Sequence, residues 1–398
     1  MDDDTPHPAT RLIHDPYRAP ADFDAPMPGV FKASTVYFPD LQAMRSRTWV
    51  DKSAYTYGLH GTPTTFTLEA RLAALEGARH VLLAPSGLAA ITAVDSAVLG
   101  QGDTLVLPDN VYGSRKPFVQ QELARWGVAS RVYDPMDPAS LAAVLDASVR
   151  LVWLEGAGSV TMEFPDLRGL VRTVRQHARP GTLVAIDHTW GAGLAYRPFD
   201  LGEGLGADIA VHALTKYPSG GGDVLMGSIS CVDDALYERL AWAHSRSGLG
   251  VGANDVELLL RSLPTMPLRY AAQDATTRRI AAWCSRQSEF VRVLHPPTPG
   301  SPGHEHWAAH CTQAAGLLSV EVRPDVAPAH VDAFVQALRW FRIGWSWGGP
   351  VSLAVPYPIS AMRELPTPYR GVIVRLSIGL EDADDLIEDL AQALVQLR

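Results

Sequence analysis

The sequence predicts an α/β fold in which a mostly parallel central sheet carries helices on both faces, followed by a smaller C-terminal α+β domain. Short apolar runs of strand length alternate with helical stretches between residues 66 and 214, a pattern typical of a parallel sheet with crossover helices. The alternation ends after residue 230, and the 398 residues exceed the roughly 250–300 at which one core usually stops growing. We therefore expect more than one folded unit.

Three parts are predicted along the chain. Residues 1–64 contain many prolines and two aromatic patches, at 36–38 and 55–57, and we expect an extended arm that lies on its own body or on a neighbouring subunit. Residues 65–256 are expected to form the ligand-binding domain. Residues 257–398 are expected to form the C-terminal domain.

The first half begins with a helix over residues 66–77, because Phe66, Leu68, Leu72 and Leu75 form an apolar stripe that ends at Gly77. The strands expected next are apolar runs, at 80–84, 104–107, 129–133, 151–155, 183–186 and 209–214. The helices expected between them are amphipathic or rich in small residues, at 88–99, 112–126, 138–145 and 166–177. No GxGxxG pattern follows the first strand, which argues against a nicotinamide dinucleotide.

The second half predicts an α+β arrangement. Its expected helices cover residues 235–245, 255–263, 268–290, 329–338 and 382–397, and its expected strands cover 317–322, 351–354 and 372–377. The segment HEHWAAH at 304–310 brings His304, His306 and His310 together. It has no HExxH spacing and follows a Pro/Gly loop, so we interpret it as surface loop and predict no metal site.

Composition excludes several classes of protein. The formal net charge is -9 and the sequence pI is about 5.8, which argues against nucleic acid and against an anionic membrane as partners. The three cysteines show no CxxC spacing, so we expect neither a disulfide framework nor a cysteine zinc site. The N-terminus lacks the pattern of a signal peptide, and no apolar run reaches the roughly 18 residues of a membrane span. We therefore expect a cytoplasmic protein.

Lys216 and Asp187 are the most informative residues. Lys216 follows one apolar run and precedes the glycine-rich turn 219–222, and Asp187 closes the neighbouring run. Side chains at the carboxyl ends of parallel strands converge on one crevice. A partly desolvated lysine can form a Schiff base with a carbonyl, and an acid beside it suits the ring nitrogen of pyridoxal. The plainer alternatives are a surface lysine and a helix-capping aspartate.

Three further features agree with a pyridoxal phosphate ligand. Ser86, Gly87 and Leu88 form a small-residue turn between a strand and a helix, where backbone N–H groups make an anion site. An ordinary strand-to-helix connection is the alternative. The hydroxyl of Thr215 could also hold the phosphate, and Tyr112 could stack on the ring.

The sequence resembles the Cys/Met-metabolism family of pyridoxal 5'-phosphate (PLP) enzymes, the trans-sulfuration enzymes of the type I fold. The resemblance covers nearly the whole chain and is carried by the segments DHTW at 187–190, ALTKY at 213–217, GWSWGG at 344–349 and RLSIGLE at 375–381. It implies the cofactor PLP, a sulfur amino acid as substrate and a homo-oligomer with shared active sites, which is at least a dimer and is expected to be a tetramer, although the sequence does not choose between dimer and tetramer.

The resemblance also implies roles for individual residues. Lys216 bonds the cofactor and acts in catalysis with Tyr112, which stacks on the ring that Asp187 and Thr189 hold. The phosphate positions are Ser86, Gly87, Leu88, Ala213 and Thr215, with Tyr57 reaching in from the neighbouring subunit. Arg375 binds the substrate carboxylate, and Ser346, Trp347 and Ser159 line the same place.

Within the family, GWSWGG at 344–349 and LEGAGS at 154–159 look most like bacterial cystathionine β-lyases. The γ-enzymes usually have Glu where Trp345 stands and Asn-Pro in the second segment. The expected reaction is therefore β-elimination from cystathionine, which yields homocysteine, pyruvate and ammonia. The alternatives are γ-elimination, γ-replacement or cysteine desulfurisation on the same cofactor, and a relative that binds the cofactor without turnover.

The chain departs from the family pattern at three places. The usual Tyr-Gly-Arg-Arg is Tyr57-Gly58-Leu59-His60, which removes one arginine from the phosphate and a second from the distal end of the substrate. His188 replaces a common Asn, and Gly156-Ala157 replaces a Ser-Pro pair.

Overall fold

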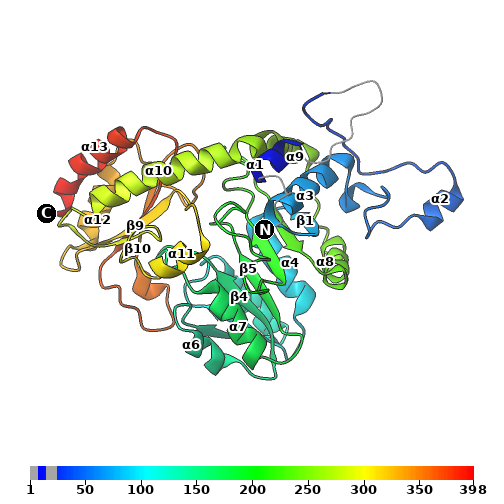
Figure 1. Ribbon diagram of the computed structural model, residues 1–398, viewed down its shortest axis with the longest axis horizontal. Coiled ribbons are helices and arrows are strands. Elements are labelled where there is room, and N and C mark those ends of the chain that lie inside the picture. Colours follow the sequence, from blue (N-terminus) through cyan, green and yellow to red (C-terminus); the bar gives the residue numbers. More distant parts are fainter. Residues whose placement is uncertain (1–7, 15–24) are drawn as a thin grey trace.

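The computed structural model describes residues 8–14 and 25–398, and its main feature is a seven-stranded sheet (Figure 1). The strand order is β1-β7-β6-β5-β4-β2-β3. The strands are β1 (His80–Ala84), β2 (Thr104–Pro108), β3 (Ala129–Tyr133), β4 (Val149–Glu155), β5 (Leu183–Asp187), β6 (Ile209–His212) and β7 (Gly227–Cys231). Neighbouring pairs from β3 to β6 are parallel, and β7 runs antiparallel to both β6 and β1. The predicted mostly parallel sheet is confirmed.

Helices cover both faces of this sheet. Successive side chains of a strand point to opposite faces and therefore belong to two different cores. In β1, Val81 and Leu83 belong to one core, and Leu82 and Ala84 belong to the other. The first core also takes side chains from α3 (Pro63–Glu76), α7 (Leu167–His177) and α9 (Ala253–Ser262). The second takes side chains from α4 (Gly87–Val98) and α8 (Asp234–Arg246). Strands buried on both faces explain why the sequence shows continuous apolar runs.

The smaller sheet is antiparallel and lies in the C-terminal part of the chain. Its strand order is β10-β11-β9-β8, with β8 (Phe290–Leu294), β9 (Leu317–Val322), β10 (Leu353–Tyr357) and β11 (Ile373–Ser377). A third core joins it to α10 (Met266–Cys284), α12 (Pro328–Ala337) and α13 (Ala383–Ala393). Figure 1 shows α10 as a long helix that runs from beside α9 towards α12 and α13. The α+β prediction for this part is confirmed.

Several predicted elements need correction. Strand β7 was not predicted, because its sequence GSISC is rich in small polar residues although all five residues are buried. The helix expected over 268–290 ends at Cys284, and β8 follows it. The expected helix at 112–126 is a short α5 (Arg115–Pro117) followed by a π-helical turn over Phe118–Leu123.

The segment HEHWAAH is the helix α11 (His304–His310), not a loop, and the burial of Trp307 explains why it is ordered. The remaining helices are α6 (Pro138–Val144) and, in the arm, α1 (Pro8–His14) and α2 (Leu41–Ser46). In Figure 1, α2 lies beyond α3 and α8, away from both sheets.

The domain boundaries at 64/65 and 256/257 stay predictions, and residues 1–7 and 15–24 of the predicted arm lie outside the described residues. Within the part of the chain that the structure describes, no helix is both long enough and apolar enough to cross a membrane.

Candidate active site

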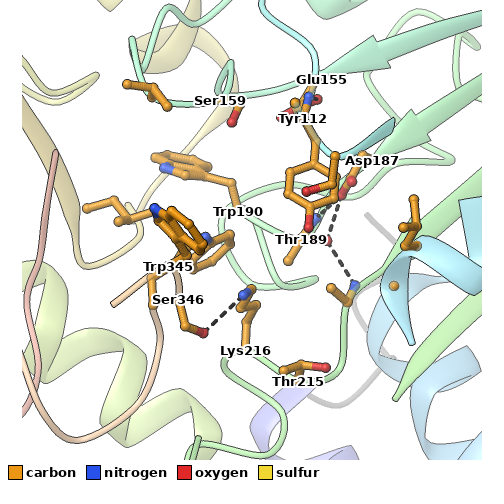
Figure 2. Close-up of a pocket in the computed structure, with 18 of the residues that line it drawn as sticks. Tyr112, Glu155, Ser159, Asp187, Thr189, Trp190, Thr215, Lys216, Trp345 and Ser346 are labelled. Atoms are coloured by element: carbon orange, nitrogen blue, oxygen red, sulfur yellow. Dashed lines mark hydrogen bonds between the residues drawn. The ribbon is translucent and has the colours of Figure 1, made fainter. Parts of the chain in front are cut away.

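A cavity of about 740 Å³ lies where the carboxyl ends of β4, β5 and β6 face residues of the smaller sheet. The predicted site residues that line it are Ser86, Gly87, Leu88, Tyr112, Ser159, Asp187, Thr189, Ala213, Thr215, Lys216, Ser346, Trp347 and Arg375. Asp187 and Thr189 lie at or just after the end of β5, and Ala213, Thr215 and Lys216 follow the end of β6. The carboxyl ends of parallel strands are a common place for ligands. Figure 2 shows Trp190 and Trp345 on one side of the cavity, with Tyr112 and Asp187 on the other.

The amine of Lys216 lies within this cavity and not on the surface. Its Nζ donates a hydrogen bond to Ser346 Oγ at 3.1 Å and lies 5.4 Å from the centre of the Trp347 ring. Burial, helped by the positive charge of Arg375, lowers the pKa of Lys216 to about 8, against the opposing effect of Asp187. Gly348 packs closely against the backbone beside Lys216, where a Cβ would lie 3.0 Å from the backbone nitrogen of Tyr217. The lysine is therefore partly neutral near physiological pH.

Asp187 ends β5 and is held in place by Thr189. Its Oδ1 accepts hydrogen bonds from the backbone N–H and from the hydroxyl of Thr189, at 3.0 and 2.6 Å. The backbone N–H of Ala213 in turn donates to Thr189 Oγ1 at 2.9 Å. The aspartate thus does cap the turn that follows it, as the plainer interpretation predicted, while it also lines the cavity.

The N-terminus of α4 forms the floor of the cavity. Ser86 is its N-cap and accepts a hydrogen bond from the backbone N–H of Ala89 at 3.0 Å. Gly87 is required here, because a Cβ would lie 2.6 Å from the Cβ of Ala213. Ser86, Gly87 and Leu88 at this helix start line the cavity, and a helix N-terminus is a favourable place for a phosphate.

Arg375 presents a buried positive charge to the cavity. Arg375 is 8% exposed, and its guanidinium carbon lies 5.2 Å from the centre of the Tyr357 ring. Burial lowers the pKa of Arg375. No carboxylate among residues 8–14 and 25–398 pairs with it, whereas another buried arginine, Arg115, pairs with Asp95 at 2.6 Å. A buried guanidinium without a carboxylate is costly unless a ligand anion neutralises it.

Tyr112 and Glu155 lie on the other side of the cavity. The backbone N–H of Tyr112 donates to Glu155 Oε2 at 2.8 Å, and the side chain of Tyr112 remains accessible, with 41% exposed. Glu155 pairs in register with Asp187 at the ends of β4 and β5. Burial first, and then the negative charge of Asp187, raise the pKa of Glu155 well above its ordinary value.

Residues 9–395 match the sequence pattern of the Cys/Met metabolism PLP-dependent enzymes. The chain belongs to this family. It is 36% identical over 387 residues to a putative cystathionine β-lyase of Rhizobium johnstonii, covering 96% of this chain and 94% of that protein. It is 36% identical over 369 residues to cystathionine β-lyase of Bordetella avium, covering 91% and 90%. A crystal structure of cystathionine γ-synthase from Xanthomonas oryzae pv. oryzae superposes with a TM-score of 0.87, at 29% identity and 98% coverage of both chains.

The protein is thus a PLP-dependent enzyme, and its cavity suits that cofactor. An amine with a lowered pKa, a fixed carboxylate and a helix N-terminus that accommodates an anion all line one space. These are the groups that a pyridine aldehyde with a phosphate arm requires. The predicted type I fold is likewise confirmed by the structural neighbours.

Several residues that line the cavity were not predicted from the sequence, among them Glu155, Trp190, Tyr357 and Met362. Glu155 could have been found, because it closes an apolar strand just as Asp187 does. Nothing in the local sequence of the other three indicates that they face the cavity.

Tyr57 is the predicted site residue that does not line the cavity. It lies in the arm, 47% exposed, and forms a β-bridge with Thr35. Its expected role in the site of a neighbouring subunit stays a prediction.

Proposed function

We propose that the protein is a carbon–sulfur β-lyase that cleaves cystathionine to homocysteine, pyruvate and ammonia. The observation that carries this proposal is that Lys216, whose amine has a lowered pKa, and Arg375, a buried guanidinium without a carboxylate partner among the described residues, line one cavity. The first is suited to exchange a proton, and the second to hold a carboxylate. Both are needed for chemistry at the Cα of an amino acid.

The cofactor would be held by residues of the large sheet. Lys216 would bond its aldehyde carbon, Asp187 would face the ring nitrogen, and Tyr112 would stack on the ring. Ser86, Gly87, Leu88, Ala213 and Thr215 would surround the phosphate. When bound, the protonated pyridine ring withdraws electrons from the substrate Cα and so makes its proton acidic.

The chain itself supplies binding, orientation and proton transfer. Arg375 binds the α-carboxylate in bidentate fashion, which fixes the Cα–H bond towards the amine of Lys216. Lys216, assisted by Tyr112, removes this proton. Ser346 accepts a hydrogen bond from Lys216 and so orients the amine. The Cβ–S bond then breaks, the sulfur takes a proton to leave as a thiol, and one water converts the remaining fragment to pyruvate and ammonia.

Support for β-elimination over γ-elimination comes from the relatives and from the loop beside Lys216. The two curated relatives described above are named cystathionine β-lyase, the first putatively. Trp345, which stands where the resemblance gives the γ-enzymes Glu, lines the cavity with 84% exposed. The indole offers no carboxylate for a second proton transfer at Cβ, which γ-chemistry requires.

A γ-elimination or γ-replacement is the second candidate, because a cystathionine γ-synthase shares the fold over nearly its whole length. The purified enzyme should be incubated with cystathionine, and pyruvate and 2-oxobutyrate should be measured in the same sample. We expect pyruvate with an equal amount of homocysteine. 2-Oxobutyrate with cysteine as the main products would replace this proposal with γ-elimination.

A Lys216→Ala variant tests the shared chemistry. We expect loss of the visible absorbance band of the lysine-bound cofactor together with loss of turnover. A matched control is Lys32→Ala, because Lys32 does not line the active-site cavity. A Lys216→Ala enzyme with full activity would exclude the assignment. A wild-type protein that binds PLP and leaves every thioether amino acid unchanged would favour a non-catalytic relative.

A further inference from the structure

A buried cluster of Glu76, His188 and His212 lies next to the active site, and the proposed reaction does not use it. Glu76 is the last residue of α3, His188 follows Asp187 directly, and His212 ends β6. His188 and His212 are fully buried, as is Glu76. Three separate stretches of the chain thus place two imidazoles and one carboxylate in the interior between α3 and the sheet.

The spacing within the cluster is that of ligands around one ion. Nδ1 of His212 lies 3.1 Å from Glu76 Oε1, and Nε2 of His188 lies 3.3 Å from the same oxygen. Ligands about 2.0–2.2 Å from a tetrahedral zinc ion are roughly 3.3–3.6 Å apart. One ligand atom from each of the three residues lies within 4.8 Å of the others. Ring rotations that move the imidazoles about an ångström closer would complete the arrangement.

Several buried polar atoms here have no hydrogen-bond partner among the described residues. They are Nδ1 of His188, Nε2 of His212 and the hydroxyl of Ser228, whereas Nε2 of His188 has only the 3.3 Å contact with Glu76. Ser228 is the cross-strand partner of His212, so its hydroxyl lies on the same face of the sheet. Leaving such a group without a partner is destabilising, and an ion or an ordered water commonly satisfies it.

The donor types favour a metal ion over water. Two imidazoles and a carboxylate form a ligand set that zinc accepts. The other oxygen of Glu76 accepts a hydrogen bond from Ser230, and such contacts orient ligands in metal sites. A divalent ion would leave one positive charge after the carboxylate of Glu76 is counted.

We propose that Glu76, His188 and His212 bind a divalent transition metal ion of the zinc type, with the hydroxyl of Ser228 or a water as the fourth ligand. The site is structural, because it is enclosed and is not part of the active-site cavity. It joins α3 to the ends of β5 and β6, the strands that carry Asp187 and lead to Lys216. No metal site was predicted from the sequence, where only the histidines at 304–310 and the cysteines were considered as ligands, and Glu76, His188 and His212 have no recognisable spacing along the chain.

Metal content of the PLP-loaded enzyme tests the proposal. The protein should be produced with and without added zinc, treated with a chelator to remove surface metal, and analysed by elemental mass spectrometry. We expect about one zinc ion per chain after growth with zinc. His188→Asn, which substitutes a poor zinc ligand, should lower the zinc content per chain at least tenfold. His306→Asn on α11 should leave the zinc content unchanged. Wild-type protein without metal, or His188→Asn with the full amount, would refute the site.

X-ray absorption at the zinc edge of the wild-type enzyme keeps the test decisive if His188→Asn does not fold. Two imidazoles with oxygen ligands at about 2.0–2.2 Å would support the assignment, and sulfur ligation would contradict it. These readouts do not depend on turnover, so they stand apart from the proposed lyase activity.

Discussion

At the scale of single residues, the site depends on charges that the fold keeps out of water. Lys216 and Arg375 are both cations with lowered pKa values, and burial is the first cause in each case. Burying this amine and a guanidinium without a carboxylate partner destabilises the folded protein. Both features make sense only for a cavity that takes up an anion and a carbonyl compound.

The pKa of Lys216 predicts how cofactor uptake depends on pH. Only the neutral amine attacks an aldehyde, and with a pKa of about 8 roughly one lysine in ten is neutral at pH 7, against about one in three thousand for an ordinary lysine. The pKa is lowered, so the neutral fraction rises through pH 8. We expect the rate at which the cofactor-free enzyme recombines with PLP, followed by absorbance, to rise with a midpoint near pH 8. A midpoint near 10 would contradict the environment described for this amine.

Arg375 predicts a difference between two substitutions. Arg375→Lys keeps the charge but loses the planar fork that binds a carboxylate in bidentate fashion. Losing one charge-assisted hydrogen bond costs about 1.5–3 kcal/mol, so KM for cystathionine should rise about ten- to hundredfold. Arg375→Ala should raise KM further. Arg370→Ala, at an exposed position outside the cavity, should leave KM unchanged. Steady-state kinetics decides, and an unaltered KM in Arg375→Lys would remove Arg375 from the substrate site.

At the scale of elements, the site is made by strand ends and one helix start. Glu155 and Asp187 are neighbours because β4 and β5 pair in register, and the negative charge of the aspartate contributes to keeping a proton on the glutamate. The N-terminus of α4 reaches them because Gly87 lets the helix pack on Ala213. Local sequence predicts each element, but register and packing decide which side chains meet.

The start of α4 allows a test that separates helix stability from cofactor binding. Ser86→Ala removes the N-cap of α4, and Asp137→Ala removes the N-cap of α6, outside the cavity. Each should lower the free energy of unfolding by about 1 kcal/mol, measured by denaturant titration. Only Ser86→Ala should weaken PLP binding, by about tenfold if one hydrogen bond to the phosphate is lost. Equal PLP affinity in the two variants would argue against Ser86 as a phosphate ligand.

At the scale of the whole molecule, residues 31–44 of the arm leave large apolar side chains exposed, although α1 packs on the first core through Leu12. Phe31, Tyr37, Leu41 and Met44 are large apolar residues within the arm that stay exposed, Tyr37 by 91%. Tyr57 is in the same segment and does not line the cavity of its own chain. Exposed apolar segments of this kind commonly mark interaction sites, which agrees with the predicted homo-oligomer.

Mixed subunits test whether sites are shared. If Tyr57 completes the site of a neighbour, a Tyr57→Ala chain and a Lys216→Ala chain refolded together should form hybrids that contain one intact site. Activity of the mixture should then exceed the summed activities of the separate variants, up to about a quarter of wild type for a random dimer in which half of the dimers are hybrids. Sedimentation should confirm at least a dimer. No gain on mixing would place Tyr57 outside the shared site.

The sequence by itself determined the fold class and the cofactor, and every predicted site residue except Tyr57 lines the cavity. Lys216, Asp187 and the turn at Ser86 were predictable because a polar residue that ends an apolar strand must lie at the edge of a parallel sheet. Such patterns are local in the sequence. The direction of each strand then decides at which edge of the sheet its last side chain lies.

Only the tertiary structure decided which distant residues meet. The missed strand β7, the Glu155–Asp187 pair, Trp190 and Tyr357 in the cavity wall, and the cluster around Glu76 all depend on register or on packing between separate stretches. Glu76 and His212 are 136 residues apart in the chain, and no periodicity connects them. Their contact follows from the packing of α3 on the sheet, which is set by many apolar side chains together.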